Sequence, residues 1–99
     1  PYYLAARRAP LIGVVVAGRL VCVAHSARRT SRACELGIAT RTEARRQGYA
    51  LAATRLWSAR VAAKGLLPLY SAFAANAPSL ALAAAAGYRA FARAAYVLA

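Results

Sequence analysis

The chain has 99 residues, 62% of them apolar, and its 14 lysine and arginine residues stand against two glutamates, for a net charge of +12. This length makes one small domain, and two cysteines with a single histidine exclude a disulfide framework and argue against a metal site, so no metal is expected. The basic excess suits phosphate-bearing partners such as coenzyme A, nucleic acid or an anionic membrane surface, although an arginine- and alanine-rich composition also fits a GC-rich genome.

The chain is predicted to divide into a short leader and one domain. Residues 1–10 form a linker or the remnant of a missing upstream element, and residues 11–99 form the domain. No apolar core followed by small residues is visible near the N-terminus, so the cytoplasm is the expected location. Either a longer parent protein or a homodimer would complete so small a unit.

The first half of the chain predicts three antiparallel strands. Apolar runs at Leu11–Val16 and Leu20–His25 flank the turn Ala17-Gly18 and predict a β-hairpin. The small and basic residues of Ser26–Ala33 predict an exposed turn, with His25 as a turn residue beside it. Cys34–Thr40 then pairs with the hairpin as the third strand.

The Ala-rich stretch Gln47–Lys64 predicts a helix, with Trp57 as a packing residue. Gly65 is placed to stop this helix. Leu66–Phe73 predicts a buried strand that returns beside Cys34–Thr40 in a right-handed parallel crossover. At helical spacing, the predicted buried arc of the helix consists of Tyr49, Ala52, Ala53, Leu56, Ala59 and Ala63.

The last third of the chain predicts a short helix and a final strand. Pro78 suits the first helical turn, Gly87 ends the helix, and Phe91–Leu98 forms the strand. The uncharged stretch Gly65–Tyr88 is long enough to span a bilayer, but its prolines and small residues favour a strand and a helix, so no membrane contact is expected. The predicted fold class is α/β, with a hairpin and a third strand leading into a parallel βαβ unit of a mixed sheet.

The segment Arg41–Ala50 joins the third strand to the long helix and predicts a phosphate cradle. Backbone N–H groups in the first turn of a helix lack intrahelical partners, and the helix dipole adds positive charge there. Gly48 has no side chain, so a diphosphate could lie against the backbone, and Ala50 keeps the next turn open. Arg45 and Arg46 can neutralise the phosphates.

These residues carry a resemblance to a known family. Arg45-x-x-Gly48-x-Ala50 after a strand resembles the coenzyme A signature of the GNAT acetyltransferases. Asn76-Ala-Pro-Ser79, followed by Leu80–Ala86 and Gly87-Tyr88, is similar to the second cofactor motif of that family. The resemblance covers most of the chain from Leu11 onward.

The resemblance implies a GNAT-like mixed sheet whose two parallel strands splay apart to admit pantetheine. It implies acetyl-CoA as the cofactor and an amine as the acceptor, with a main-chain N–H near Ile38 to Thr40 as the oxyanion donor. Asn76 is expected both to cap the second helix and to contact pantetheine, and Ser79 to cap or to touch phosphate. The cofactor-binding residues that follow from the match are Ile38, Ala39, Thr40, Arg45, Arg46, Gln47, Gly48, Tyr49, Ala50, Asn76 and Ser79.

Two residues are the catalytic candidates. Glu35 is the carboxylate on the third strand and the leading base, although a base in relatives aligns better with Cys34 or Leu36, and an ion pair with an arginine is the alternative role. The resemblance places the usual tyrosine acid at Ala83, so Tyr70 or solvent would replace it. Tyr70 as a core residue is the alternative.

The expected function is therefore acyl transfer from acetyl-CoA to a primary amine by direct attack on the thioester. A basic nucleic-acid-binding module is one alternative, and a catalytically silent GNAT-like fragment that still binds coenzyme A is another. The nucleic-acid alternative is supported by a crowded set of arginines in one stretch of sequence, namely Arg28, Arg29, Arg32, Arg41, Arg45 and Arg46.

Overall fold

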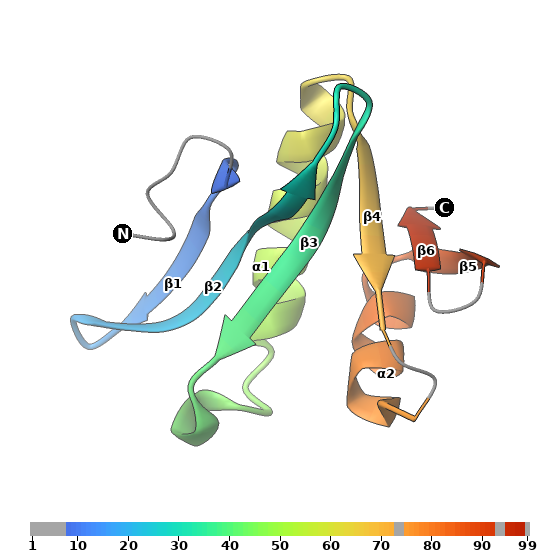
Figure 1. The fold of residues 1–99 in the computed structure, drawn as a ribbon. Coiled ribbons are helices and arrows are strands. Elements are labelled where there is room, and N and C mark those ends of the chain that lie inside the picture. The colour runs from blue at the N-terminus through green and yellow to red at the C-terminus, as the bar shows by residue number, and fades with distance from the viewer. Residues whose placement is uncertain (1–7, 73–74, 93–94, 99) are drawn as a thin grey trace.

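Six strands form one mixed sheet in the computed structural model, which describes residues 8–72, 75–92 and 95–98 (Figure 1). In the sheet the strands lie in the order β1-β2-β3-β4-β6-β5. Only β3 and β4 run parallel, and the other neighbouring strands are antiparallel. The strand bounds are β1 (Ile12–Val16), β2 (Arg19–Arg29), β3 (Ala33–Thr40), β4 (Leu67–Ser71), β5 (Tyr88–Ala92) and β6 (Ala95–Leu98).

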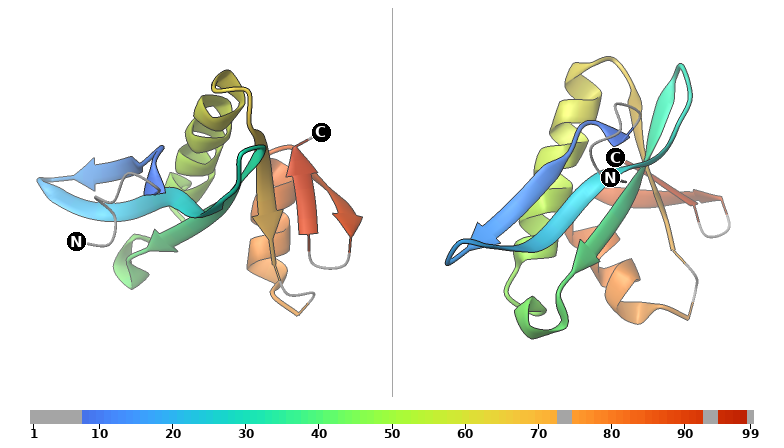
Figure 2. Two further views of the ribbon diagram at one scale, coloured as in Figure 1. Left: turned by 45° about the horizontal axis from the view of Figure 1, so that its top comes forward. Right: turned by 60° about the vertical axis from the view of Figure 1, so that its left-hand side comes forward.

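Three helical segments connect these strands. The short 3-10 helix η3 (Thr42–Ala44) and the helix α1 (Tyr49–Ala63) lie between β3 and β4, and the helix α2 (Ala77–Ala85) lies between β4 and β5. Both α-helices pack on the same face of the sheet (Figure 2). No helix in the described part of the chain covers the other face. The predicted hairpin, third strand and parallel βαβ unit are all confirmed.

Turn chemistry explains why the hairpin and the helix ends were predictable. Ala17 and Gly18 both have positive φ, at 51° and 77°, as a tight two-residue hairpin turn requires. Gly65, at φ 76°, follows the C-cap of α1 and ends it. Pro78 lies in the first turn of α2, and Asn76 is its N-cap, with Asn76 Oδ1 accepting a hydrogen bond from the N–H of Ser79 at 3.1 Å.

The predicted exposed turn at Ser26–Ala33 is wrong in its first half. β2 continues to Arg29, and Ser26 is fully buried. Its hydroxyl accepts from Trp57 Nε1 at 3.3 Å and donates to the carbonyl of Ala9 at 2.8 Å, so a polar residue fits inside the core. His25 is likewise no turn residue, because it lies within β2 and is only 6% exposed.

The predicted buried arc of α1 is confirmed at Ala53, which is buried, and at Tyr49, which is half-buried, and is wrong at the other positions. Leu56 is 45% exposed, whereas Trp57 packs in the core as predicted. The apolar residues of this Ala-rich helix occur on all of its sides, so their spacing in the sequence does not single out one buried face. Two polar residues, Thr54 and Ser58, also belong to the buried face. Ser58 Oγ donates to the carbonyl of Thr54 at 2.7 Å and shares a 2.5 Å hydrogen bond with the hydroxyl of Tyr88. The buried residues are Ala53, Thr54, Trp57, Ser58 and Val61.

The single final strand predicted at Phe91–Leu98 is wrong as well. Gly87, at φ 91°, turns the chain straight from α2 into β5, and β5 then pairs with β6 as an antiparallel hairpin. Tyr88, taken as the end of the motif, is the first residue of β5 and is buried. Two parts of the sequence-based prediction lie outside the described residues. They are residues 1–7 of the predicted linker at residues 1–10, and Phe73 at the end of the predicted strand Leu66–Phe73.

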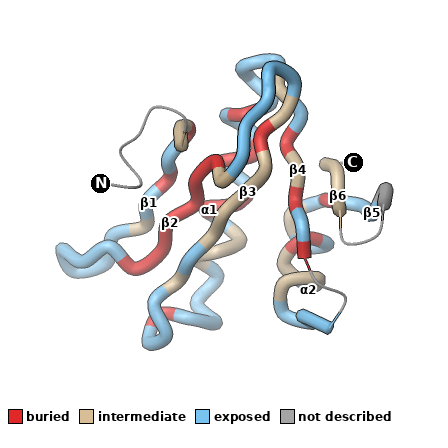
Figure 3. Tube along the Cα trace, viewed as in Figure 1, coloured by how far each residue is buried: buried red, intermediate tan, exposed pale blue. Residues whose placement is uncertain are grey.

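The core has two parts. Figure 3 shows buried stretches along β2 and β4. The first part lies between α1 and strands β1 to β3 and centres on Trp57, and the second part lies beside α2 and includes Tyr70, Ala83 and Tyr88. Leu36 packs against both parts. The two cysteines, Cys22 and Cys34, are buried free thiols of the first part.

Candidate functional site

The two parallel strands share only a short paired segment. Their pairs are Ala33 with Leu67, Cys34 with Pro68, and Glu35 with Leu69. Beyond Glu35, β3 continues to Thr40 with no partner on β4 in the described residues, and the two strands diverge (Figure 1). We call this opening the fork. Its vertex lies at Glu35, and its open end lies where β3 runs into η3 and α1.

The register of β3 against β2 decides which main-chain groups face the fork. The N–H of Arg41 donates to the carbonyl of Val21 at 2.8 Å, and the register is unbroken from there to the pair of Ser26 with Leu36. Because hydrogen-bonded and non-hydrogen-bonded pairs alternate in an antiparallel ladder, Ala39 directs its main-chain groups toward β2. Leu36, Ile38 and Thr40 direct theirs toward the fork.

The turn between η3 and α1 leaves a run of amides without protein acceptors. Within the described parts of the chain, none of the N–H groups of residues 46–51 donates to a protein acceptor, and the first that does is that of Ala52, to the carbonyl of Gly48 at 3.1 Å. Gly48 is the N-cap of α1, at φ 81°, and Arg46 also has a positive φ of 64°. A left-handed conformation at such positions turns successive N–H groups toward one point, which is a common anion-binding arrangement.

The side chains of this turn differ in their surroundings. Arg45, Arg46 and Gln47 are exposed, whereas Tyr49 and Ala50 are half-buried and pack against the first core. A Cβ built on Gly48 would meet no atom within 4 Å, so the space above the amides is open. Tyr49 and Ala50 can therefore contribute their N–H groups to a ligand while their side chains hold the helix in place.

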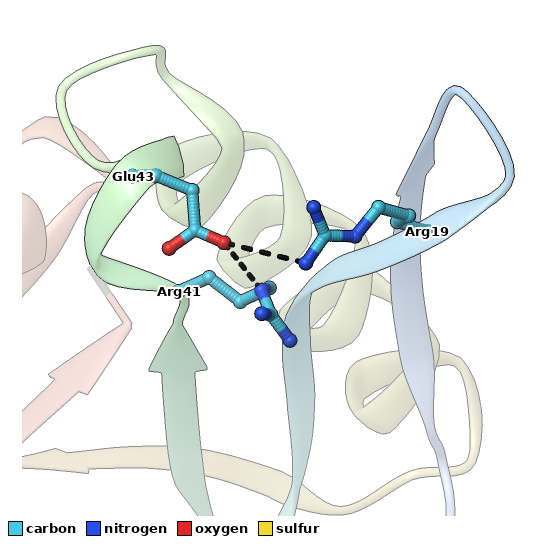
Figure 4. Close-up of polar contacts among 3 residues, drawn as sticks. All are labelled: Arg19, Arg41 and Glu43. Atoms are coloured by element: carbon cyan, nitrogen blue, oxygen red, sulfur yellow. Dashed lines mark hydrogen bonds and ion pairs between the residues drawn. The ribbon is translucent and has the colours of Figure 1, made fainter.

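Glu43 lies between the turn and the β1–β2 hairpin and contacts an arginine from each side (Figure 4). Its Oε1 accepts a hydrogen bond from Arg41 Nε at 2.5 Å and lies 3.8 Å from Arg19 Nη2. The hydrogen bond from Arg41 is the main reason that the pKa of Glu43 is lowered. Sequence reasoning missed this contact, although Glu43 is one of only two acidic residues in the chain. Among the described residues, no carboxylate pairs with Arg45 or Arg46, the other two arginines of this turn.

A hollow of about 290 Å³ lies between that hairpin and the turn, on the opposite side of β3 from β4. Arg19 and Val21 line it from the hairpin, and Glu43, Gln47 and Tyr49 line it from the turn. It is shallow and open to solvent. The hollow does not lie in the fork. It is therefore a different feature from the run of unpaired amides, and the two adjoin at Gln47 and Tyr49.

Glu35 lies at the vertex of the fork on the helix-free face of the sheet. Cys34 and Leu36 pack into the cores beneath the helices, and side chains alternate along a strand, so Glu35 points away from the helices. Its side chain is 18% exposed, and its Oε2 lies 3.6 Å from Nε of Arg28, the residue opposite it on β2. Of the two positions at which relatives were expected to carry a base, Cys34 is buried and Leu36 is half-buried.

Tyr70 lies on the helix-covered face of β4 and is only 3% exposed. Its ring packs against Tyr88 and Tyr96, with ring centroids 5.5 and 6.2 Å away. Its hydroxyl donates to the carbonyl of Ser79 at 3.0 Å and lies 2.8 Å from Ser79 Oγ. Burial raises the pKa of Tyr70, and the hydrogen bond with Ser79 opposes that shift.

The fold brings most of the predicted site residues to one end of the molecule. The N-termini of α1 and α2 both lie at the open end of the fork (Figures 1 and 2). The turn before α1 supplies residues 45–50 there, and the cap of α2 supplies Asn76 and Ser79. Glu35 stands apart at the vertex, and its side chain is on the opposite face from that of Tyr70.

The comparisons with known proteins agree with this geometry. The family model for GNAT acetyltransferase matches residues 10–96, so the chain belongs to the GNAT acetyltransferase family. A GCN5-related N-acetyltransferase-like protein from Streptococcus suis is 28% identical, with a TM-score of 0.74 over 86% of this chain and 32% of that one. A ribosomal-protein-alanine N-acetyltransferase from Brucella melitensis is 19% identical and shares the fold, with a TM-score of 0.71 over 90% of this chain and 65% of that one.

The chain thus spans less than two thirds of the length of either solved structure. A search of curated protein sequences finds no match. Within the described residues, neither α1 nor α2 combines the length and the apolar character that a membrane span requires.

Proposed function

We propose that this chain binds acetyl-CoA across the fork and transfers the acetyl group to a primary amine. The observation that carries the proposal is the run of unpaired amides at residues 46–51, at the open end of two diverging parallel strands. A diphosphate accepts hydrogen bonds from such amides, and the dipole of α1 adds to the attraction. Arg45 and Arg46 supply the countercharge.

Pantetheine would lie between β3 and β4. Its amides are donors and acceptors, and they match the main-chain groups that Ile38 and Thr40 direct toward the fork. Ala39 contributes less in this proposal than in the sequence-based prediction, because its main-chain groups face β2. Asn76 would keep its role as the cap of α2 and reach the ligand with its amide nitrogen, since its Oδ1 is engaged by Ser79.

The acetyl group would then lie near the vertex, where the acceptor amine approaches from the helix-free face. Glu35 lies on that face, so it would take the proton from the amine, directly or through a water. A main-chain N–H that β3 directs toward the fork would stabilise the oxyanion. When the thiolate leaves, the hydroxyl of Tyr70 or a water would protonate it, since a tyrosine hydroxyl is protonated at neutral pH.

Two measurements test the proposal separately. Isothermal titration with acetyl-CoA tests the cofactor site, and a thiol-release assay with a panel of primary amines tests turnover. Binding with amine-dependent release supports the whole proposal. Binding without release for any amine supports the silent fragment instead, and absence of acetyl-CoA binding refutes the cofactor site.

A further inference from the structure

The fold separates the arginines that crowd one stretch of sequence into two groups. Arg28, Arg29 and Arg32 lie at the β2–β3 connection, and Arg41, Arg45 and Arg46 follow the other end of β3. The eight residues of β3 between them span about 25 Å. A ligand bound at the fork would therefore contact only the second group of arginines.

A different segment of the chain joins the first group. α1 ends close to the β2–β3 connection, and the N–H of Leu67 donates to the carbonyl of Arg32 at 2.8 Å (Figure 1). Arg60 and Lys64, at the end of α1, are one helical turn apart and are both exposed. Four exposed cations from two distant segments thus lie at the end of the molecule opposite the turn that precedes α1. We call Arg29, Arg32, Arg60 and Lys64 the basic pole.

The basic pole carries positive charge that the described part of the protein does not balance. Its neighbour Arg28 is paired with Glu35 at 3.6 Å, and Glu43 pairs with Arg19 and Arg41 at the other end of the sheet. No other Asp or Glu exists in the chain. The β2–β3 connection is also held in shape, because Thr30 Oγ1 accepts hydrogen bonds from the N–H groups of Arg32 and Ala33 at 3.2 and 3.1 Å.

We propose that the basic pole binds the phosphodiester backbone of nucleic acid, independently of acetyl-CoA. A nucleic-acid strand presents a phosphate about every 3.4 Å of helix axis, so all four cations can find phosphates at once. Guanidinium groups bind phosphate oxygens through two parallel hydrogen bonds. The pole presents no exposed aromatic side chain in the described residues, so the contacts are with the backbone and binding is independent of base sequence.

The surroundings of the pole favour nucleic acid over a protein or a membrane. A protein interface needs an apolar centre, and an interfacial membrane site needs apolar anchors. Two large apolar side chains are exposed near the pole among the described residues, namely Leu67 and Leu56, which lies one helical turn before Arg60. The surface is thus charged without the apolar area that either of those partners requires.

Fluorescence anisotropy with a 20-base-pair DNA duplex and the matching RNA duplex tests this proposal. We expect a Kd of roughly 10⁻⁴ to 10⁻⁶ M near physiological salt and a slope of log K against log salt of about −3.6 for four phosphate contacts. Arg29→Gln with Arg32→Gln should halve that slope to about −1.8 and leave acetyl-CoA affinity unchanged. Arg45→Gln with Arg46→Gln removes the same charge at the other end, and it should weaken acetyl-CoA binding while leaving the duplex slope unchanged.

Thermal unfolding followed by circular dichroism should confirm that both double variants fold. The proposal is overturned if the two variants lower duplex affinity equally, because net charge alone would then explain binding. It is also overturned if polyglutamate or phosphatidylserine vesicles bind more tightly than the duplexes at equal charge concentration. Failure of acetyl-CoA binding in the unsubstituted chain would refute the cofactor site and leave this proposal standing.

Discussion

Glu35 on β3 and Leu69 on β4 form the last residue pair that the two parallel strands share. The position of Glu35 thus marks the vertex of the fork, and strand alternation turns its carboxylate toward the helix-free face, from which the proposed acceptor amine would approach. The same carboxylate lies 3.6 Å from Nε of Arg28 and could therefore serve as a structural ion pair instead of a base. The two roles predict different effects of substituting Glu35 and Arg28.

Replacing Glu35 with glutamine keeps the size of the side chain and removes the base. We expect amine-dependent thiol release to fall about a hundredfold, with acetyl-CoA affinity unchanged, because general base catalysis contributes at least that much. Steady-state kinetics and calorimetry measure the two effects. Arg28→Gln is the matched control, since it breaks the same ion pair and keeps the carboxylate; equal losses in both variants would assign Glu35 a purely structural role.

Gly48→Asp should weaken acetyl-CoA binding by at least roughly tenfold, about 1.4 kcal/mol, because a carboxylate would occupy the space of the diphosphate. Gly65→Asp is the control at the other end of α1. Gly48 and Gly65 have φ of 81° and 76°, and neither has an atom within 4 Å of a built Cβ, so both substitutions carry the same backbone strain. Calorimetric titration measures the affinities, and unchanged affinity in Gly48→Asp would contradict the cofactor site.

Tyr70→Phe removes the hydroxyl that contacts Ser79 and retains the ring in the second core. We expect a loss of about 1 kcal/mol in the free energy of unfolding and a fall of about a hundredfold in thiol release. Tyr88→Phe removes a buried hydroxyl that bonds to Ser58, so it should cost similar stability without the kinetic effect. Urea denaturation and the release assay compare the variants, and identical kinetics would exclude Tyr70 as the proton donor.

Gly37→Ala should destabilise the fold by about 1 to 3 kcal/mol through overpacking. A Cβ on Gly37 would lie 2.4 Å from Cε1 and 2.6 Å from Nε2 of His25, a buried imidazole on the facing strand. His25→Ala provides the missing space, so adding Gly37→Ala to that variant should cost little more. Urea denaturation of the two single variants and the double variant tests this coupling, and additive losses would contradict it.

The stability of the protein should decline at alkaline pH. Burial raises the pKa of both Tyr70 and Tyr88 above the ordinary value of 10.0. The unfolded chain then releases protons at a lower pH than the folded chain, so the stabilising contribution is complete below about pH 10 and is lost as pH rises through the folded pKa values. Thermal unfolding from about pH 8 to about pH 11.5 should show this fall, and Tyr70→Phe with Tyr88→Phe should flatten it.

Much of the turn before α1, and of the succession of elements from β1 to α2, followed from local chemistry. Gly18, Gly48, Gly65 and Pro78 act through their own backbone preferences, so the hairpin turn, the start and end of α1 and the first turn of α2 could be predicted within a few residues. The motif around Gly48, together with the motif from Asn76 to Tyr88 and the order of the two along the chain, indicated the family. These features depend on neighbours in sequence.

The faces of the elements depended on contacts that the sequence does not display. Ser26 and Ser58 are polar yet buried, because partners from distant segments satisfy their hydroxyl groups. Thr54 is buried although its Oγ1 has no hydrogen-bond partner among the described residues, and the uniform alanine content of α1 concealed the buried face of that helix. His25 is also polar and buried, and it lies opposite Gly37 on β3.

The sequence by itself determined the order of the elements from β1 to α2 and the turn that bears Gly48, because torsional preferences and missing side chains act locally. Only the tertiary structure decided that β3 and β4 separate after Glu35, that Ile38 rather than Ala39 faces the fork, and that Arg32 adjoins the end of α1. Those relationships follow from strand register and from packing between segments far apart in the chain, which no local preference specifies.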